Sequence, residues 1–127
     1  MAETTTETYR TVTPYLVVPD GDREIGFLES AFGAQISVCE RKPDQSLMHA
    51  EIRIGDSMVM VGQAGEQWKA QKASLYLWVE NVDEVYAKAL AAGAESISPP
   101  EDKPYGHRNA GVADPSGNTW WIGSPVK

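Results

Sequence analysis

An internal repeat constrains the fold of this 127-residue chain more than any other feature. The run from Thr13 to Val18 is rich in β-branched and aromatic residues, and it returns 61 positions later as the run from Ser74 to Val79. Each run is followed by a polar break that can cap a helix and then by a helical segment that ends at a Gly-Ala pair. The repeat predicts two similar modules, each too small to bury its own sheet.

Both halves have the pattern βαβββ. We predict helices over residues 23–32 and 83–92, because a glycine follows each segment and can end a helix. Further strands are expected at residues 35–40, 48–54 and 57–61 in the first half and at 96–97, 110–113 and 119–122 in the second. Loops are expected at 62–72 and at 98–106, the latter held open by three prolines. We expect a disordered tail at 1–9 and one domain over 10–127, with modules at about 11–62 and 73–123.

The charge balance narrows the possible partners. The chain has 11 Lys and Arg against 18 Asp and Glu, a net charge of −7, so no basic surface for nucleic acid is expected. No apolar stretch approaches the roughly 20 residues needed to cross a bilayer. The first residues lack the features of a signal peptide, and the single Cys39 cannot form an internal disulfide. These features predict a cytoplasmic protein without a membrane partner.

Strand alternation predicts which side chains lie on the concave face of each module, because every second residue points to the same side. Apolar residues such as Leu16, Ile52 and Leu77 suit the face that a helix covers. The opposite parity gives the predicted site residues, with His107 added from the loop after the prolines: Tyr15, His49, Glu51, Arg53, Met60, Tyr76, Trp78, His107 and Trp121. Aromatic walls with a few polar groups are typical of a small-molecule site, although the same rings could simply fill the interior.

The polar members of this set allow more than one interpretation. Glu51 and Arg53 are two apart on one strand and could form an ion pair that only satisfies buried charge. Alternatively, His49 could act as a general base that Glu51 orients, or begin a metal site of unusual composition. His107 could help to close the cavity as part of a lid, or could be a solvated loop histidine.

The two modules, with Asp114-Pro-Ser-Gly-Asn118 before the last strand, resemble the vicinal oxygen chelate superfamily of glyoxalase and bleomycin-resistance proteins over residues 11–123. The segments Met48-His-Ala-Glu-Ile52 and Tyr105-Gly-His-Arg108 are similar to its PhnB-like branch. The resemblance implies an α+β fold in which the two βαβββ modules form an incomplete barrel around a shared cavity. It also implies a homodimer.

Most enzymes of that superfamily hold a divalent metal on one side chain from the first and one from the last strand of each module. The corresponding positions here are Thr13, Met60, Ser74 and Trp121. None of these is a histidine or a carboxylate, so the usual metal site cannot assemble. We therefore expect no metal or other cofactor and a protein that binds, and sequesters, a small cationic or aromatic molecule. The alternative is an enzyme of the lyase, isomerase or dioxygenase type that uses a relocated metal or His49 as its base.

Overall fold

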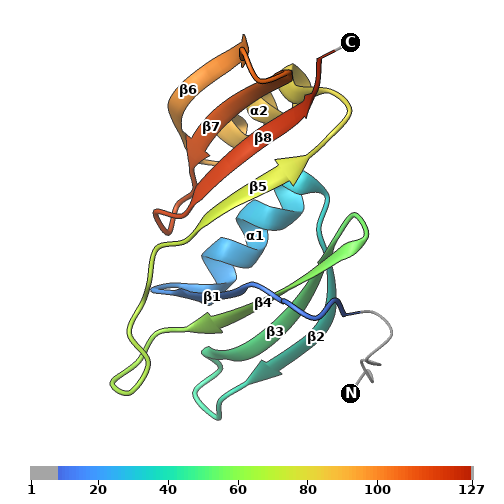
Figure 1. The fold of residues 1–127 in the computed structure, drawn as a ribbon. Helices are drawn as coiled ribbons and strands as arrows, with labels where there is room; N and C mark the ends of the chain where they lie inside the picture. The colour runs from blue at the N-terminus through green and yellow to red at the C-terminus, as the bar shows by residue number, and fades with distance from the viewer. Residues whose placement is uncertain (1–8, 127) are drawn as a thin grey trace.

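The computed structural model describes residues 9–126, and it has an α+β fold of two four-stranded sheets and two helices (Figure 1). The first half contains β1 (Tyr15–Val18), α1 (Gly21–Phe32), β2 (Gln35–Arg41), β3 (Leu47–Ile54) and β4 (Ser57–Gln63). The second contains β5 (Ser74–Trp78), α2 (Val82–Ala91), β6 (Glu95–Asp102), β7 (His107–Ala113) and β8 (Thr119–Pro125). The prediction of two βαβββ modules is confirmed.

The repeat extends to strand order and register. The sheets run β1-β4-β3-β2 and β5-β8-β7-β6, and in each one the first strand is parallel to the last strand of its module. Tyr15 pairs with Met60, and Tyr76 pairs with Trp121 in the same way. Because these registers match, each residue of β1 and β4 has an identifiable equivalent in β5 and β8.

Local sequence explains where the helices begin and end. The side chain of Asp20 caps α1 by accepting a hydrogen bond from the amide of Arg23 at 3.2 Å, and Gly33 ends it with a φ of 68°. Asn81 caps α2 through the amide of Glu84 at 3.1 Å. The apolar face of α1 is buried, including Leu28 at 0% exposure. Neither described helix has the length and apolar content needed to span a bilayer.

The two modules share one hydrophobic core, and the helices lie on the inner side of both sheets. The predicted helix-facing residues Leu16 and Ile52 are buried, at 1% and 0% exposure, as is Ile122 of β8 at 0%. Helices α1 and α2 pack against each other, and α1 lies between the two sheets (Figure 1). The rings of Phe32 in α1 and Trp120 in β8, 4.9 Å apart, join the modules. No strand of one sheet pairs with a strand of the other, so the two sheets are not closed into a barrel within the described residues.

The prediction of a loop over 98–106 is wrong in part. Strand β6 continues through Pro99 and Pro100 to Asp102, because β6 is an edge strand and a proline, which lacks an N–H, is tolerated there. The register with β7 shifts between Ser98 and Glu101, where the prolines lie. Strand β7 begins at His107, so this histidine belongs to a strand and not to a loop. The predicted tail at 1–9 lies outside the described residues except for Tyr9.

Candidate functional site

The open face of the first sheet carries a chain of hydrogen bonds centred on His49. Its Nε2 lies 2.9 Å from Oε2 of Glu51, and its Nδ1 lies 3.3 Å from the hydroxyl of Tyr15. The hydroxyl of Tyr9 donates to Oε1 of Glu51 at 2.5 Å. Burial and the Glu51 carboxylate, by its hydrogen bond and its charge, raise the pKa of Tyr9. The chain thus runs Tyr9–Glu51–His49–Tyr15.

This geometry defines what His49 can do. An ionised carboxylate only accepts hydrogen bonds, so Nε2 of His49 donates to Glu51 and Nδ1 of the neutral ring accepts from Tyr15. Both ring nitrogens are therefore engaged. His49 orients the hydroxyl of Tyr15 and can act as a base toward a ligand only after that hydroxyl moves away.

A recess of about 460 Å³ lies beside this chain. Tyr15 and His49 form part of its wall, and the segment between β4 and β5 brings Trp68 to its rim with 72% of the side chain exposed. The carbonyl of Trp68 accepts a hydrogen bond from the amide of Gly65 at 2.8 Å, which shapes this segment. Of the residues that line the recess, the predicted site contained only Tyr15 and His49, and Lys42, Met48 and Trp68 are among those that sequence reasoning missed. Only the presence of a tryptophan in a polar, glycine-containing loop could have indicated one of them.

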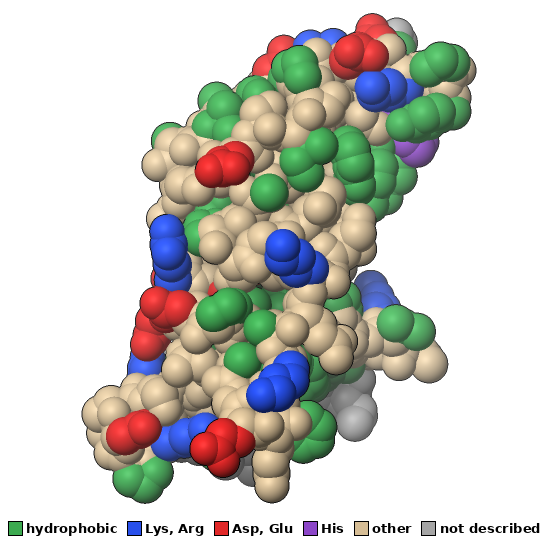
Figure 2. Space-filling view, turned by 90° about the vertical axis from the view of Figure 1, so that its left-hand side faces the viewer, with side chains coloured by type: hydrophobic (Ala, Val, Ile, Leu, Met, Phe, Trp, Pro, Cys, Tyr) green, Lys and Arg blue, Asp and Glu red, His purple; other side chains and the backbone are tan. Residues whose placement is uncertain are grey.

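On the open face of the second sheet, aromatic rings surround His107. The ring centroids of Trp78, Tyr105 and Tyr76 lie 4.7, 5.1 and 5.7 Å from that of His107. The hydroxyl of Tyr76 lies 3.0 Å from Nδ1 of His107. Despite this packing, Trp78 is 56% exposed and Tyr105 is 63% exposed. Figure 2 shows a histidine among hydrophobic side chains at the upper edge of the molecule.

Asn109 holds two of these rings in place. Its Nδ2 donates to the hydroxyl of Tyr76 at 3.2 Å and to that of Tyr105 at 2.9 Å. Asn109 is buried, at 2% exposure, so its amide is a fixed support beneath the exposed rings. Sequence reasoning missed both Tyr105 and Asn109, because Tyr105 lies in the turn before β7 and Asn109 gives no signal by itself.

Glycines make room for the site rings. A Cβ atom at Gly62 would lie 2.9 Å from the hydroxyl oxygen of Tyr15, and one at the equivalent Gly123 would overlap that of Tyr76. In the second sheet, a Cβ at Gly111 would also lie 2.5 Å from the ring of Trp121. The register makes Gly111 the equivalent of Glu51, so Trp121 covers the place where the first sheet has its carboxylate.

The structure divides the predicted site residues into two groups, each on the open face of one sheet. The first-module face contains Tyr15, His49, Glu51, Arg53 and Met60. The second-module face contains Tyr76, Trp78, His107 and Trp121. Because the helices lie inside the two sheets, neither the recess beside His49 nor the groove between the modules contains members of both groups.

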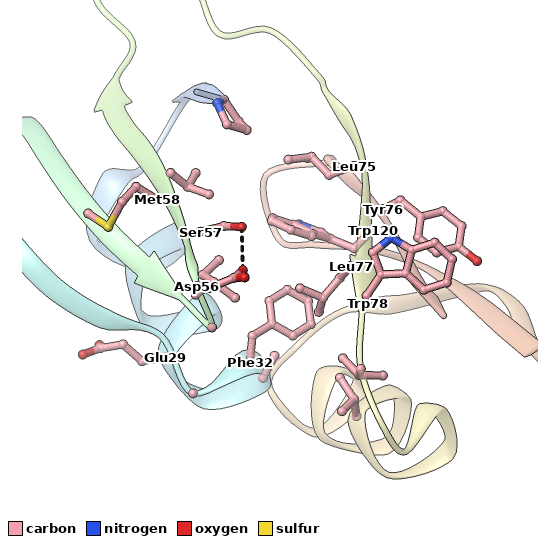
Figure 3. Close-up of a pocket in the computed structure, with 18 of the residues that line it drawn as sticks. Glu29, Phe32, Asp56, Ser57, Met58, Leu75, Tyr76, Leu77, Trp78 and Trp120 are labelled. Carbon is pink, nitrogen blue, oxygen red and sulfur yellow. Dashed lines mark hydrogen bonds between the residues drawn. The ribbon is translucent and has the colours of Figure 1, made fainter. Parts of the chain in front are cut away.

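A groove of about 650 Å³ runs between the modules (Figure 3). Leu75, Leu77 and Trp120 border it on the second-module side, and Met58 with the turn at Asp56 and Ser57 borders it on the first-module side (Figure 3). Figure 3 shows Tyr76 and Trp78 on the other side of β5 from the two leucines. The groove is thus largely apolar and follows β5, and Tyr76 and Trp78 belong both to its lining and to the ring cluster around His107.

Few side chains that could coordinate a metal ion lie at the positions where the resembled superfamily holds one. The positions equivalent to the usual ligands of the resembled superfamily are Thr13, Met60, Ser74 and Trp121, a set with no histidine and no carboxylate. Across residues 9–126 no group of three or more His, Cys, Asp or Glu side chains could hold a metal ion. The residues present do not fit the metal centre that the superfamily usually carries.

Two βαβββ modules, each with a helix on one face and an open face with exposed aromatic rings on the other, define a glyoxalase-like fold. The sequence profile of the glyoxalase/bleomycin resistance protein/dioxygenase superfamily matches residues 9–122, and the chain belongs to this superfamily. The resemblance inferred from the repeat is thereby confirmed at the level of the superfamily.

Known proteins agree with this assignment. An uncharacterized protein of Mycobacterium bovis is 34% identical, with 91% of this chain and 84% of that protein covered. The crystal structure of TioX from Micromonospora sp. ML1 superposes with a TM-score of 0.79 at 28% identity, covering 92% of this chain and 99% of TioX. The fosfomycin resistance protein FosX from Mesorhizobium loti shares the fold, with a TM-score of 0.68 at 16% identity over 92% of each chain.

Proposed function

We propose that this protein binds and sequesters a planar aromatic small molecule without the help of a metal ion. The observation that carries the proposal is the cluster of exposed rings around His107. Trp78 and Tyr105 lie edge to face against the His107 ring and remain more than half exposed. Tyr105 is held by the buried amide of Asn109, and Trp78 packs on Tyr76 with 4.7 Å between ring centroids. Exposed aromatic side chains supported in this way suit stacking with a flat ligand. Membership of a superfamily named in part for bleomycin resistance supports sequestration.

The hydrogen bonds of the cluster add a polar preference. Tyr76 receives a hydrogen bond from Asn109, and its own proton points to Nδ1 of His107. The neutral imidazole then carries its proton on Nε2, which has no hydrogen-bond partner among the described residues. A ligand with a carbonyl or ring nitrogen at its edge would accept this proton in a hydrogen bond.

The charge of the chain supports a cationic ligand over an anionic one. The net charge of −7 attracts cations, and the faces of Trp and Tyr rings stabilise them. On the first-module face the carboxylate of Glu51 adds a negative group. A cationic planar aromatic compound therefore satisfies both faces.

We also propose that the binding cavity is completed by a second copy of the chain. Each open face is only half of a cavity, and the helical layer separates the two faces of one chain. Strands β1 and β5 each have one edge without a strand neighbour in their sheets, and the apolar groove runs beside β5. A two-fold related copy would cover these edges and bring the first-module face of one chain against the second-module face of the other. Light scattering tests this, because a monomer mass would contradict it.

Isothermal titration calorimetry with proflavine, a cationic planar heteroaromatic, tests the ligand class. Trp78→Ala should weaken binding by about 5- to 150-fold, since stacking on one ring is worth roughly 1–3 kcal/mol. Ile97→Ala removes another exposed apolar side chain outside the ring cluster and should leave binding unchanged. Equal binding by the wild type and Trp78→Ala, or no binding by the wild type, would contradict the proposal.

An enzyme is the second candidate function, and the Glu51–His49 pair at 2.9 Å is the observation that favours it. A carboxylate that orients a histidine is a common arrangement in general base catalysis and in metal sites. Elemental analysis of protein purified without chelators separates the candidates. A stoichiometric divalent metal that is lost in His49→Ala would support the enzyme and contradict metal-free binding.

Two finer assignments belong with this proposal. The segments Met48 to Ile52 and Tyr105 to Arg108 support a place in the PhnB-like branch of the superfamily. The single cysteine and the acidic composition support a cytoplasmic location.

A further inference from the structure

Glu24 is a buried carboxyl group in α1 that takes no part in the proposed ligand site. It lies in the first turn of α1, and its side chain is fully buried, at 0% exposure. The hydroxyl of Ser116 donates to Oε1 of Glu24 at 2.7 Å, across 92 positions of sequence. Ser116 belongs to the turn between β7 and β8, so this contact joins the helix of the first module to the second module.

Asp114, at the start of the same turn, is held by three donors. Its Oδ1 accepts hydrogen bonds from the amides of Ser116 and Asn118, both at 2.9 Å. Its Oδ2 accepts from Nε1 of Trp120 at 2.9 Å. Asp114 is also buried, at 4% exposure, and Ser116 bonds to both carboxyl groups, through its amide to Asp114 and through its hydroxyl to Glu24. The turn thus presents a fixed acceptor to the carboxyl group on α1.

Two buried carboxyl groups side by side cannot both carry a charge without a large cost. Oε2 of Glu24 is buried and receives no hydrogen bond from the described residues, and an ionised carboxylate could not donate one to Asp114. A proton on Oε2 removes both problems, because it gives this atom an acceptor in Asp114. Burial, followed by the hydrogen bond to Asp114 and the charge of Asp114, raises the pKa of Glu24 to about 8, although Ser116 and Asn118 oppose the shift.

The other charged groups near α1 do not add to the electrostatic interaction between Glu24 and Asp114. Strands β1, β3 and β4 present apolar side chains to the helix, among them Leu16, Ile52 and Val61. On α2, the Glu84–Lys88 pair is exposed, with 58% of each side chain accessible. Lys72 packs its side chain against Gly117 in the β7–β8 turn. Among the described residues, only Asp114 acts on Glu24 with a charge.

We propose that Glu24 holds a proton at neutral pH and that this proton joins the two modules, so that its loss in alkaline solution loosens the contact between α1 and the β7–β8 turn. The group would make the relative position of the two open faces depend on pH. The proposal stands on the buried contact between modules and does not depend on the identity of the ligand.

Denaturant unfolding at a series of pH values tests the proposal. A group whose pKa is raised in the folded state stabilises fully below its unfolded pKa, and this stability is lost as pH rises through the folded value. From about pH 4.5 to about pH 8, Glu24 should therefore raise the unfolding equilibrium constant by up to about tenfold per pH unit. Glu24→Gln should remove this contribution, whereas Glu29→Gln, an exposed position on the same helix, should keep it. Identical pH profiles for the wild type and Glu24→Gln would overturn the proposal.

A second measurement serves if Glu24→Gln does not fold. Infrared spectra of wild-type protein with isotopically labelled glutamate should show the carbonyl band of a protonated acid at pH 7, and this band should disappear above pH 8. Amide exchange should report the loosening, because the protection factors of Ser116 and Asn118 should fall with the band. A spectrum without the protonated band at pH 7, or protection factors that do not follow its loss, would overturn the proposal.

Discussion

Tyr15 and Tyr76 are equivalent residues of the two modules, and the hydroxyl of each is bonded to Nδ1 of a histidine. The distances are 3.3 Å to His49 and 3.0 Å to His107. The two histidines are not themselves equivalent, since the register makes Asn109 the counterpart of His49. The modules therefore keep the tyrosine at one position and supply its histidine partner from different positions, which gives each face its own chemistry.

Gly123→Ala should displace Tyr76 from His107. A Cβ at this position overlaps the end of the Tyr76 side chain, which can move at lower cost than the backbone. The loss of its hydrogen bonds to Asn109 and His107 should lower the free energy of unfolding by about 1–2 kcal/mol. Denaturant unfolding measures this. Gly65→Ala is the control, because a Cβ there meets nothing within 4 Å and should change stability little. Equal stability of the two variants would show that the ring does not depend on Gly123.

Tyr76→Phe should cost more than the removal of an exposed tyrosine hydroxyl. The change takes one acceptor from the amide of Asn109, which is buried at 2% exposure. We expect a loss of about 1–2 kcal/mol in the free energy of unfolding. Tyr86→Phe removes an exposed hydrogen bond to Ser96 of 2.7 Å and should cost less, about 0.5 kcal/mol. If the two losses are equal, Asn109 does not depend on Tyr76.

Gly26→Ala should stabilise the protein. Gly26 lies inside α1, and a Cβ there meets nothing within 4 Å. An alanine in a helix interior is more stable than a glycine by about 0.5–1 kcal/mol. Thermal unfolding should show a higher midpoint, and a lower one would indicate that this helix face is covered by a partner.

The repeat made most of the fold predictable from sequence. Because alternation fixes which face of a strand is buried, Leu16, Val18 and Ile52 could be placed in the core, and each is buried to 1% exposure or less. The continuation of β6 through Pro99 could not be predicted, since it depends on β6 having a neighbour on only one side. The pairing of His49 with Glu51 was predicted, but the residues that support the two faces, Tyr9, Tyr105 and Asn109, were beyond the sequence because only the folded chain brings them to Glu51 and Tyr76.

The proposed cavity takes its first-module face from one chain and its second-module face from the other. A mixing experiment with two variants tests this arrangement. Tyr15→Ala damages the first-module face, and Trp78→Ala damages the second-module face. If each cavity takes one face from each of two copies, every cavity in either pure variant contains one damaged face. A mixed dimer then contains one cavity with both faces damaged and one with both faces intact.

Binding should therefore return when the two variants are unfolded together and refolded as a mixture. Random pairing makes half of the dimers mixed, and half of the cavities in these are intact. About one quarter of all cavities should then bind proflavine with wild-type affinity, because a two-fold dimer has two equivalent cavities. Calorimetric stoichiometry measures this fraction against each variant refolded alone. If the mixture forms dimers and binding does not return, the two faces of one cavity do not come from different chains.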